Sequence, residues 1–312
     1  MVMRILSWLG IIIPAVTLLI ALPTLFATGG GAGMVLGNAA EAGWVLVLIA
    51  LAIAPVRTIG GKAVAGAWFA GFFGVLSLAT LIARPVVNRL GADSVFAVAI
   101  WAPVTEELAK LLPVALFLLL AIRSSRARPS AGDALLFGAT VGAGFAVYEN
   151  TLYARAFGGF GGNPPLSLLV PTLQSDGSML VGGHLVYTGL TAFGLGAALA
   201  YRRRHRLIWL AAPLGFAVSV TEHITANALS FAEPPAWAGI TQILTLDGYL
   251  STLLLVAGVA AVAIVERRSL RRVGLAATGI RETLRPKREL LAGRAAALAY
   301  VQCGPQTSEV RS

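Results

Sequence analysis

The stretch VFAVAIWAPVTEELAKLLPVALFLLLAI, residues 95–122, decides how the chain folds. It is longer and more apolar than the roughly 20 residues that a helix needs to cross a bilayer. Yet Glu106, Glu107 and Lys110 within it carry charge. An ionisable side chain in a membrane-spanning helix is costly unless it is paired or lines a wet cavity. The stretch therefore predicts a transmembrane helix that contributes polar groups to a site.

Apolar stretches of this length recur along the chain. Hydrophobic residues make up 57% and charged residues only 12% of the 312 residues, which excludes a water-soluble globular protein. We expect an all-α polytopic membrane bundle of about eight transmembrane helices, with Pro103 kinking or breaking the fourth. The approximate ranges are 5–27, 36–56, 63–83, 95–122, 133–154, 178–201, 206–230 and 245–265. The first range is interpreted as an uncleaved helix rather than a secretory signal, because its apolar part is long and no clean cleavage site closes it.

The basic residues indicate the orientation. Ten of the 24 lysines and arginines lie from Arg267 onwards, and most others fall in every second loop. This is a positive-inside pattern and not a nucleic-acid-binding patch, so we predict cytoplasmic termini and no nucleic-acid partner. We divide the chain into N-terminal helices (1–94), a core (95–230), a last helix (231–266) and a basic cytoplasmic tail (267–312). The tail is expected to be flexible, with 280–300 either an amphipathic helix or solvated.

Four polar residues on four predicted helices fall at one depth. At about 1.5 Å per residue from the basic flanks, Glu106, Glu149, His184 and His223 all lie about 24–27 Å into the membrane. A common depth on helices of alternating direction predicts a convergent site in the outer half of the bilayer. Purely structural roles also remain open, since Glu106 and Lys110 are spaced for an i, i+4 ion pair and the others suit interhelical hydrogen bonds.

Other catalytic and binding motifs are absent from the sequence. It contains neither HExxH nor GxSxG, and its glycine-rich stretches do not end in Lys-Ser/Thr as a phosphate-binding loop would. The single cysteine, Cys303, excludes an intrachain disulfide.

The polar motifs resemble those of the PrsW family, which is related to the CAAX-processing and bacteriocin-processing (CPBP) membrane proteases. The motifs are PVTEELAK (103–110), GAGFAVYENTLY (142–153), GH (183–184) and HITAN (223–227), and they cover roughly residues 95–230. Lys110 follows Glu107 by three residues, as in the PrsW branch. Wider CPBP proteins usually carry arginine four residues after the second glutamate instead. Glu149 stands where the CAAX enzymes have histidine.

The resemblance implies an intramembrane protease of the bacterial plasma membrane. Better-known members make the first cut in an anti-sigma factor, so the implied partner is a single-span membrane protein in the same lipid bilayer. A proton- or ion-coupled transporter that uses the same glutamates and histidines is the alternative, and a catalytically silent scaffold is a third interpretation. No inverted repeat of the polar motifs supports a transporter.

Hydrolysis by water needs a base, an oxyanion stabiliser and a proton donor. By resemblance Glu106 is the base, with His184 or His223 orienting water and Asn227, one turn beyond His223, stabilising the oxyanion. The candidate catalytic residues are Glu106, Glu107, Glu149, His184, His223 and Asn227, supported by Lys110 and Asn150.

A metal-dependent mechanism is equally compatible with these residue types. Glu107 or Glu149 with His184 and His223 forms the carboxylate and two-imidazole set of many catalytic zinc sites. We slightly favour the metal-free mechanism, because Lys110 partly neutralises the carboxylates and HExxH is absent. The sequence leaves both mechanisms open.

Overall fold

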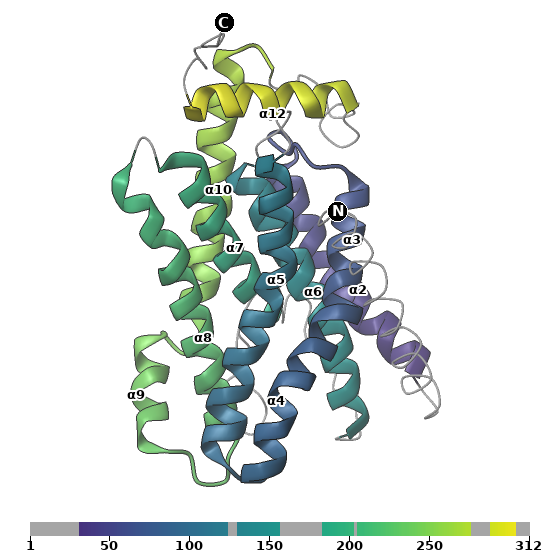
Figure 1. The fold of residues 1–312 in the computed structure, drawn as a ribbon, viewed down its shortest axis with the longest axis vertical. Helices are drawn as coiled ribbons and strands as arrows, with labels where there is room; N and C mark the ends of the chain where they lie inside the picture. The colour runs from purple at the N-terminus through teal and green to yellow at the C-terminus, as the bar shows by residue number, and fades with distance from the viewer. Residues whose placement is uncertain (1–30, 124–129, 157–182, 203–204, 276–287, 304–312) are drawn as a thin grey trace, which may run out of the picture.

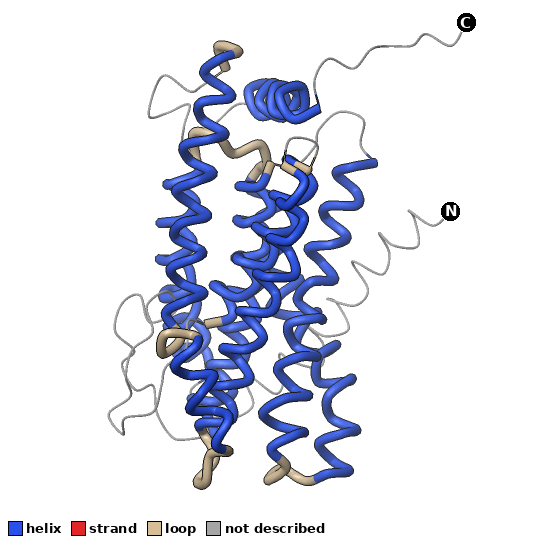
Figure 2. The backbone as a smooth tube through the Cα atoms, turned by 90° about the vertical axis from the view of Figure 1, so that its left-hand side faces the viewer, coloured by secondary structure: helices blue, strands red, loops and turns tan. Residues whose placement is uncertain are grey.

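The protein is all-helical throughout the part that the computed structural model describes (Figure 1 and Figure 2). The described residues are 31–123, 130–156, 183–202, 205–275 and 288–303. This confirms the predicted fold class. The predicted range 5–27, with the question of a cleaved signal, lies outside these residues.

Four helical segments are long and apolar enough to cross a membrane. They are 61–90, 131–152, 206–229 and 236–272. The predicted count of eight is therefore not confirmed. The helix over 102–123 is not among the four, because Glu106, Glu107 and Lys110 lower its apolar content.

The helices follow one another in an up-and-down order. Three of the long helices contain a segment of different pitch, a π-helix in η1 and η2 and a 3₁₀ turn in η3. The elements are α2 (Gly31–Ile53), α3 (Gly61–Phe69), η1 (Ala70–Val75), α4 (Leu76–Leu90), η2 (Phe96–Trp101), α5 (Ala102–Arg123), α6 (Ala131–Ala156), α7 (His184–Tyr201), η3 (Arg206–Leu210), α8 (Ala211–Leu229), α9 (Ala236–Leu244), α10 (Tyr249–Arg272) and α12 (Arg288–Cys303).

Helix α6 is the centre of the bundle, since 94% of its spanning window is buried against at most 33% for the other three segments. Its glycines allow backbones to touch. A Cβ atom on Gly142 would lie 2.1 Å from the carbonyl oxygen of His184, and one on Gly144 would lie 2.2 Å from that of Trp68. Small residues at these positions thus permit close helix contacts. The contact at Gly142 brings the start of α7, and with it His184, onto α6.

The start of α6 is fixed by a capping box. Ser130 Oγ accepts a hydrogen bond from the Asp133 amide at 2.9 Å, and the Asp133 carboxylate accepts one from the Ser130 amide at 3.2 Å. The same carboxylate binds the amides of Thr58 and Ile59, and Glu266 of α10 accepts from the Ala131 amide. Asp133 therefore caps the start of α6 and ties it to the segment after α2.

The segment around Pro103, where we expected a kink or a break, changes helix type instead. A π-helix, η2, occupies Phe96–Trp101, and Pro103 is the second residue of the α-helix that follows it. Proline removes a hydrogen-bond donor and crowds the preceding turn, and the wider π-turns accommodate both effects. The helix continues past the proline and carries Glu106 and Glu107.

The last predicted span, 245–265, is part of a longer broken helix. Helices α9 and α10 belong to one apolar segment of 37 residues, 236–272. The break has three consecutive residues with left-handed backbone: Leu246 (φ 53°), Asp247 (φ 53°) and Gly248 (φ 80°). Such a conformation is uncommon for residues other than glycine, so the surrounding structure must hold it in place.

Helix α12 lies across one end of the bundle (Figure 1). Helix α12 (Arg288–Cys303) covers the second half of the stretch 280–300, for which either an amphipathic surface helix or a solvated tail was expected. Arg294 is fully buried and donates hydrogen bonds of 3.3 Å to the carbonyl oxygens of Ala54 and Arg57, just past the end of α2. A cation at a helix C-terminus satisfies carbonyl groups that lack intrahelical partners.

Candidate active site

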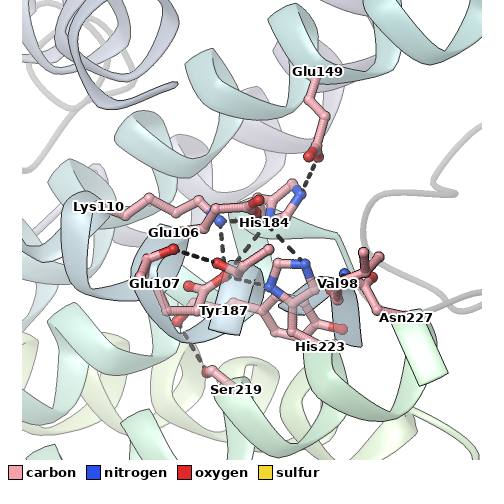
Figure 3. Close-up of polar contacts among 12 residues, drawn as sticks. Val98, Glu106, Glu107, Lys110, Glu149, His184, Tyr187, Ser219, His223 and Asn227 are labelled. Atoms are coloured by element: carbon pink, nitrogen blue, oxygen red, sulfur yellow. Dashed lines mark hydrogen bonds and ion pairs between the residues drawn. The ribbon is translucent and has the colours of Figure 1, made fainter. Parts of the chain in front are cut away.

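Six of the predicted site residues come together from four helices (Figure 3). They are Glu106, Glu107 and Lys110 of α5, Glu149 of α6, His184 of α7 and His223 of α8. The ring centroids of the two histidines are 4.9 Å apart. We call these six residues the Glu/His cluster.

Glu107 and Lys110 form the interior of the Glu/His cluster. The Lys110 ammonium donates to Glu107 Oε1 at 2.7 Å, and the side-chain exposures are 0% and 3%. The same oxygen accepts a hydrogen bond of 3.0 Å from His223 Nδ1. Lys110 Nζ also lies 4.0 Å from the centre of the Phe145 ring, a cation–π contact. One carboxylate oxygen therefore holds both the lysine and a histidine in place.

Both ring nitrogens of His184 are engaged. Lys110 Nζ lies 2.6 Å from Nδ1, and Nε2 contacts Glu149 Oε2. Because an ammonium group can only donate, Nδ1 must be the acceptor and Nε2 must carry the proton that it donates to Glu149. Lys110 thereby selects the tautomer of His184.

His223 and Glu106 face one another without a hydrogen bond. His223 Nδ1 donates to Glu107, which leaves the lone pair on Nε2 free. Glu106 Oε2 lies 3.7 Å from this Nε2 and is buried without a hydrogen-bond partner. A buried carboxylate oxygen is normally bound, so this pair of atoms is suited to a small ligand or ion.

Within the described residues, the side chains of the Glu/His cluster differ in exposure. The exposures of Glu106 and Glu149 are 15% and 12%, whereas Lys110 is fully buried. Aromatic rings close one side, with Phe145 edge-on to His184 and Tyr187 stacked on His223 at a centroid distance of 5.8 Å. Among the described residues, Glu106 and Glu149 are therefore the carboxylates of the cluster that are least enclosed by protein.

Two predicted residues have other contacts. The Asn227 amide donates to the carbonyl oxygen of Val98 in η2 at 3.1 Å, and so it ties α8 to the π-helix that precedes Glu106. Asn150 is partly buried beside Glu149. Within the described part of the chain it has no hydrogen bond to the Glu/His cluster.

Two aromatic residues and one carboxylate at this site were not predicted from the sequence. Phe145 and Tyr187 occupy apolar helix positions that do not differ in sequence from ordinary core residues. Glu222, immediately before His223, is completely buried. An acidic residue beside a candidate histidine in an apolar span was a usable signal that was missed.

The residues fit a divalent cation. Donor atoms of Glu106, His184 and His223 all lie within 4.8 Å of one another. This set has Glu106 in place of the Glu107 or Glu149 that we expected as the carboxylate ligand. Glu107 instead contacts Nδ1 of His223, as carboxylates do behind histidine ligands.

A helical membrane protein with a buried set of glutamates and histidines belongs to a class that includes membrane-embedded hydrolases. The model of the PrsW family, described as intramembrane metalloproteases, matches residues 54–264, and the chain belongs to this family. The match extends beyond the motif region on both sides. No curated protein and no solved structure matches the chain.

Membership of this family makes the protein an integral membrane protein and an intramembrane protease. The transporter alternative receives no support from the comparisons.

Proposed function

We propose that the protein is a divalent-cation-dependent endopeptidase that cuts a single-span membrane protein near the outer surface of the bilayer. The observation that carries the proposal is the buried, unpartnered Glu106 Oε2 opposite the free Nε2 of His223. Glu106, His184 and His223 would hold the cation, with Nε2 of His184 giving up to Glu149 the proton that it otherwise donates there. Zinc is the candidate that best suits these ligands. Bound there, the cation would supply a Lewis acid that polarises the peptide carbonyl group and acidifies water.

The other members of the Glu/His cluster orient these ligands. Glu107 fixes the ring of His223 through Nδ1, and Lys110 fixes both Glu107 and His184. Glu149 is the remaining carboxylate; its side chain is partly exposed and contacts His184 Nε2. We therefore assign proton exchange with water to Glu149.

The metal assignment predicts that activity is lost when divalent ions are removed. Protein purified in detergent and returned to lipid should cleave a membrane-tethered reporter, contain near-stoichiometric metal by elemental analysis, and lose both in a strong chelator. Zinc should restore cleavage. Full activity in metal-free protein would contradict this proposal and support the metal-free mechanism with Glu106 as the base.

The substrate proposal follows from the depth of the site and from the resemblance. The Glu/His cluster lies about 25 Å from the Arg123 end of α5, since Glu106 precedes Arg123 by 17 residues. If that end is cytoplasmic, cleavage occurs near the outer surface, where a substrate helix can unwind and meet water. A bacterial anti-sigma factor with one span is a substrate of this kind. Relation to the wider CPBP group rests on the motif resemblance alone.

The orientation has a direct test. With Cys303 replaced by serine, single cysteines at Asp93, in the turn before η2, and at Arg206, in η3, mark opposite ends of the bundle. Both side chains are exposed. We expect a membrane-impermeant thiol reagent applied to intact cells to label position 93 and not position 206. The reverse pattern would place both termini outside and the site near the cytoplasm.

A further inference from the structure

Helix α8 is fastened by polar contacts on two of its faces. Ser219, His223 and Asn227 are spaced by four residues and share one face, which contacts α7, α5 and η2. Glu222 and Thr225 lie on a second face, which contacts α10 and α9. The first face holds the candidate ligand His223. The second has no role in the chemistry proposed above.

Glu222 binds the first turn of α10. One carboxylate oxygen accepts a hydrogen bond of 2.7 Å from the Ser251 amide, and the other accepts one from the Ser251 hydroxyl. Both residues are completely buried. Ser251 is the third residue of α10, and Gly248 at the N-cap provides no side-chain cap. Glu222 therefore supplies, from another helix, the cap and the negative charge that a helix N-terminus favours.

This contact lies beside the break between α9 and α10. Leu246 and Asp247 hold left-handed backbone there, which costs free energy and persists only where neighbouring structure fixes it. The break thus gives α8 a rigid partner at the level of His223, since Glu222 and His223 are adjacent in the chain. A shift or rotation of α8 would have to break the contact between Glu222 and Ser251.

We propose that Glu222 is a positioning residue for His223: by capping α10 it fixes the rotation and height of α8 and so aims His223 at Glu106. This inference rests on the proposed function for its catalytic consequence. Its structural consequence, the position of the His223 ring, is measured through the hydrogen bond between His223 Nδ1 and Glu107 and does not depend on catalysis.

Two substitutions separate the hydrogen bonds from the charge. Glu222→Ala removes both contacts with Ser251. Glu222→Gln can keep both, since its amide oxygen accepts from the backbone and its amide group donates to the hydroxyl. We expect Glu222→Ala to lower kcat by about 10- to 100-fold with KM within about twofold, because a misplacement near 1 Å has effects of this size. Glu222→Gln should restore most of the activity.

A spectroscopic readout tests the geometry without catalysis. The chain has three histidines, so imidazole ¹⁵N signals can be assigned with His205→Gln and His223→Gln, each of which removes one set of signals. In full-length protein in lipid nanodiscs, Glu222→Ala should shift the His223 signals and abolish the protected Nδ1 proton. The signals should return in Glu222→Gln.

Thr225→Val is the matched control. It removes a buried contact of α8 with Thr241 of α9, at 2.7 Å, and nearly conserves volume. We expect a small loss of thermal stability, unchanged His223 signals and activity within a few-fold of wild type. If Glu222→Ala does not accumulate, Ser251→Ala keeps the backbone hydrogen bond and should shift the same His223 signals to a smaller extent.

Unchanged His223 signals in Glu222→Ala, or in Ser251→Ala where that variant replaces it, would overturn the proposal. So would a kcat loss no larger than that of Thr225→Val. Failure of the wild-type protein to cleave any membrane-tethered reporter would refute the proposed function instead, and the His223 spectrum would still decide whether Glu222 positions the ring.

Discussion

Glu106→Gln should reduce cleavage by at least about 10³-fold. A single acid or base usually contributes about 10²–10⁴-fold, so this loss lies above the lower end of that range. The substitution keeps the size of the side chain but removes its charge at the unpartnered Oε2 that faces His223. Metal content should fall with activity, because an amide is a weaker ligand than a carboxylate. Cleavage of a membrane-tethered reporter and elemental analysis of the same sample measure both effects.

The matched control for this variant is Glu233→Gln. Glu233 is exposed in the turn between α8 and α9, so its loss of charge should change neither cleavage nor metal content. We expect His184→Ala and His223→Ala to behave like Glu106→Gln. Activity within a few-fold of wild type in all three variants would be incompatible with catalysis by the Glu/His cluster.

Lys110→Met should destabilise the protein by about 3–5 kcal/mol, the usual cost of removing one partner of a buried ion pair. Lys110 is fully buried and donates to both Glu107 and His184, so the variant leaves a buried carboxylate without its ammonium. The tautomer of His184 would also lose the group that selects it. Thermal unfolding in detergent, followed by circular dichroism, gives the size of the effect.

Lys62→Met is the control, since Lys62 is exposed on α3 and its loss should change the unfolding temperature little. The double variant Lys110→Met/Glu107→Gln should recover part of the stability, because it removes the unpaired charge as well. If Lys110→Met unfolds like wild type, the ion pair does not contribute to stability and our account of the interior of the Glu/His cluster is wrong.

The membrane class and much of the site could be predicted from the sequence. Charged residues inside apolar spans are costly, so Glu106, Glu149, His184 and His223 stood out, and counting from the basic flanks placed them at one depth. The structure brings these four together with Glu107 and Lys110. Gly142 was recognisable for a similar reason, as a small residue in a spanning helix indicates close packing.

The details that the sequence did not reveal depend on contacts between distant segments. Which carboxylate faces Nε2 of His223 depends on how α5 is rotated against α8, and hydropathy does not determine that rotation. The π-helix before Pro103 and the left-handed residues at 246–248 have no distinct pattern of apolar residues. The resemblance gave Asn227 a role in stabilising the oxyanion, which stays a prediction, and the hydrogen bond from its amide to the Val98 carbonyl in the π-helix had no sequence signal.

The position of α12 determines where the protein can be shortened or tagged. Arg294 fills the space at the end of α2, and Leu298 beside it is almost completely buried. A version that stops after α10 would expose the carbonyl groups of Ala54 and Arg57 together with the apolar surface beneath α12. An affinity tag is therefore best attached after Cys303. A fluorescent reporter inserted between α10 and α12 needs a linker long enough for α12 to keep its contacts with the end of α2.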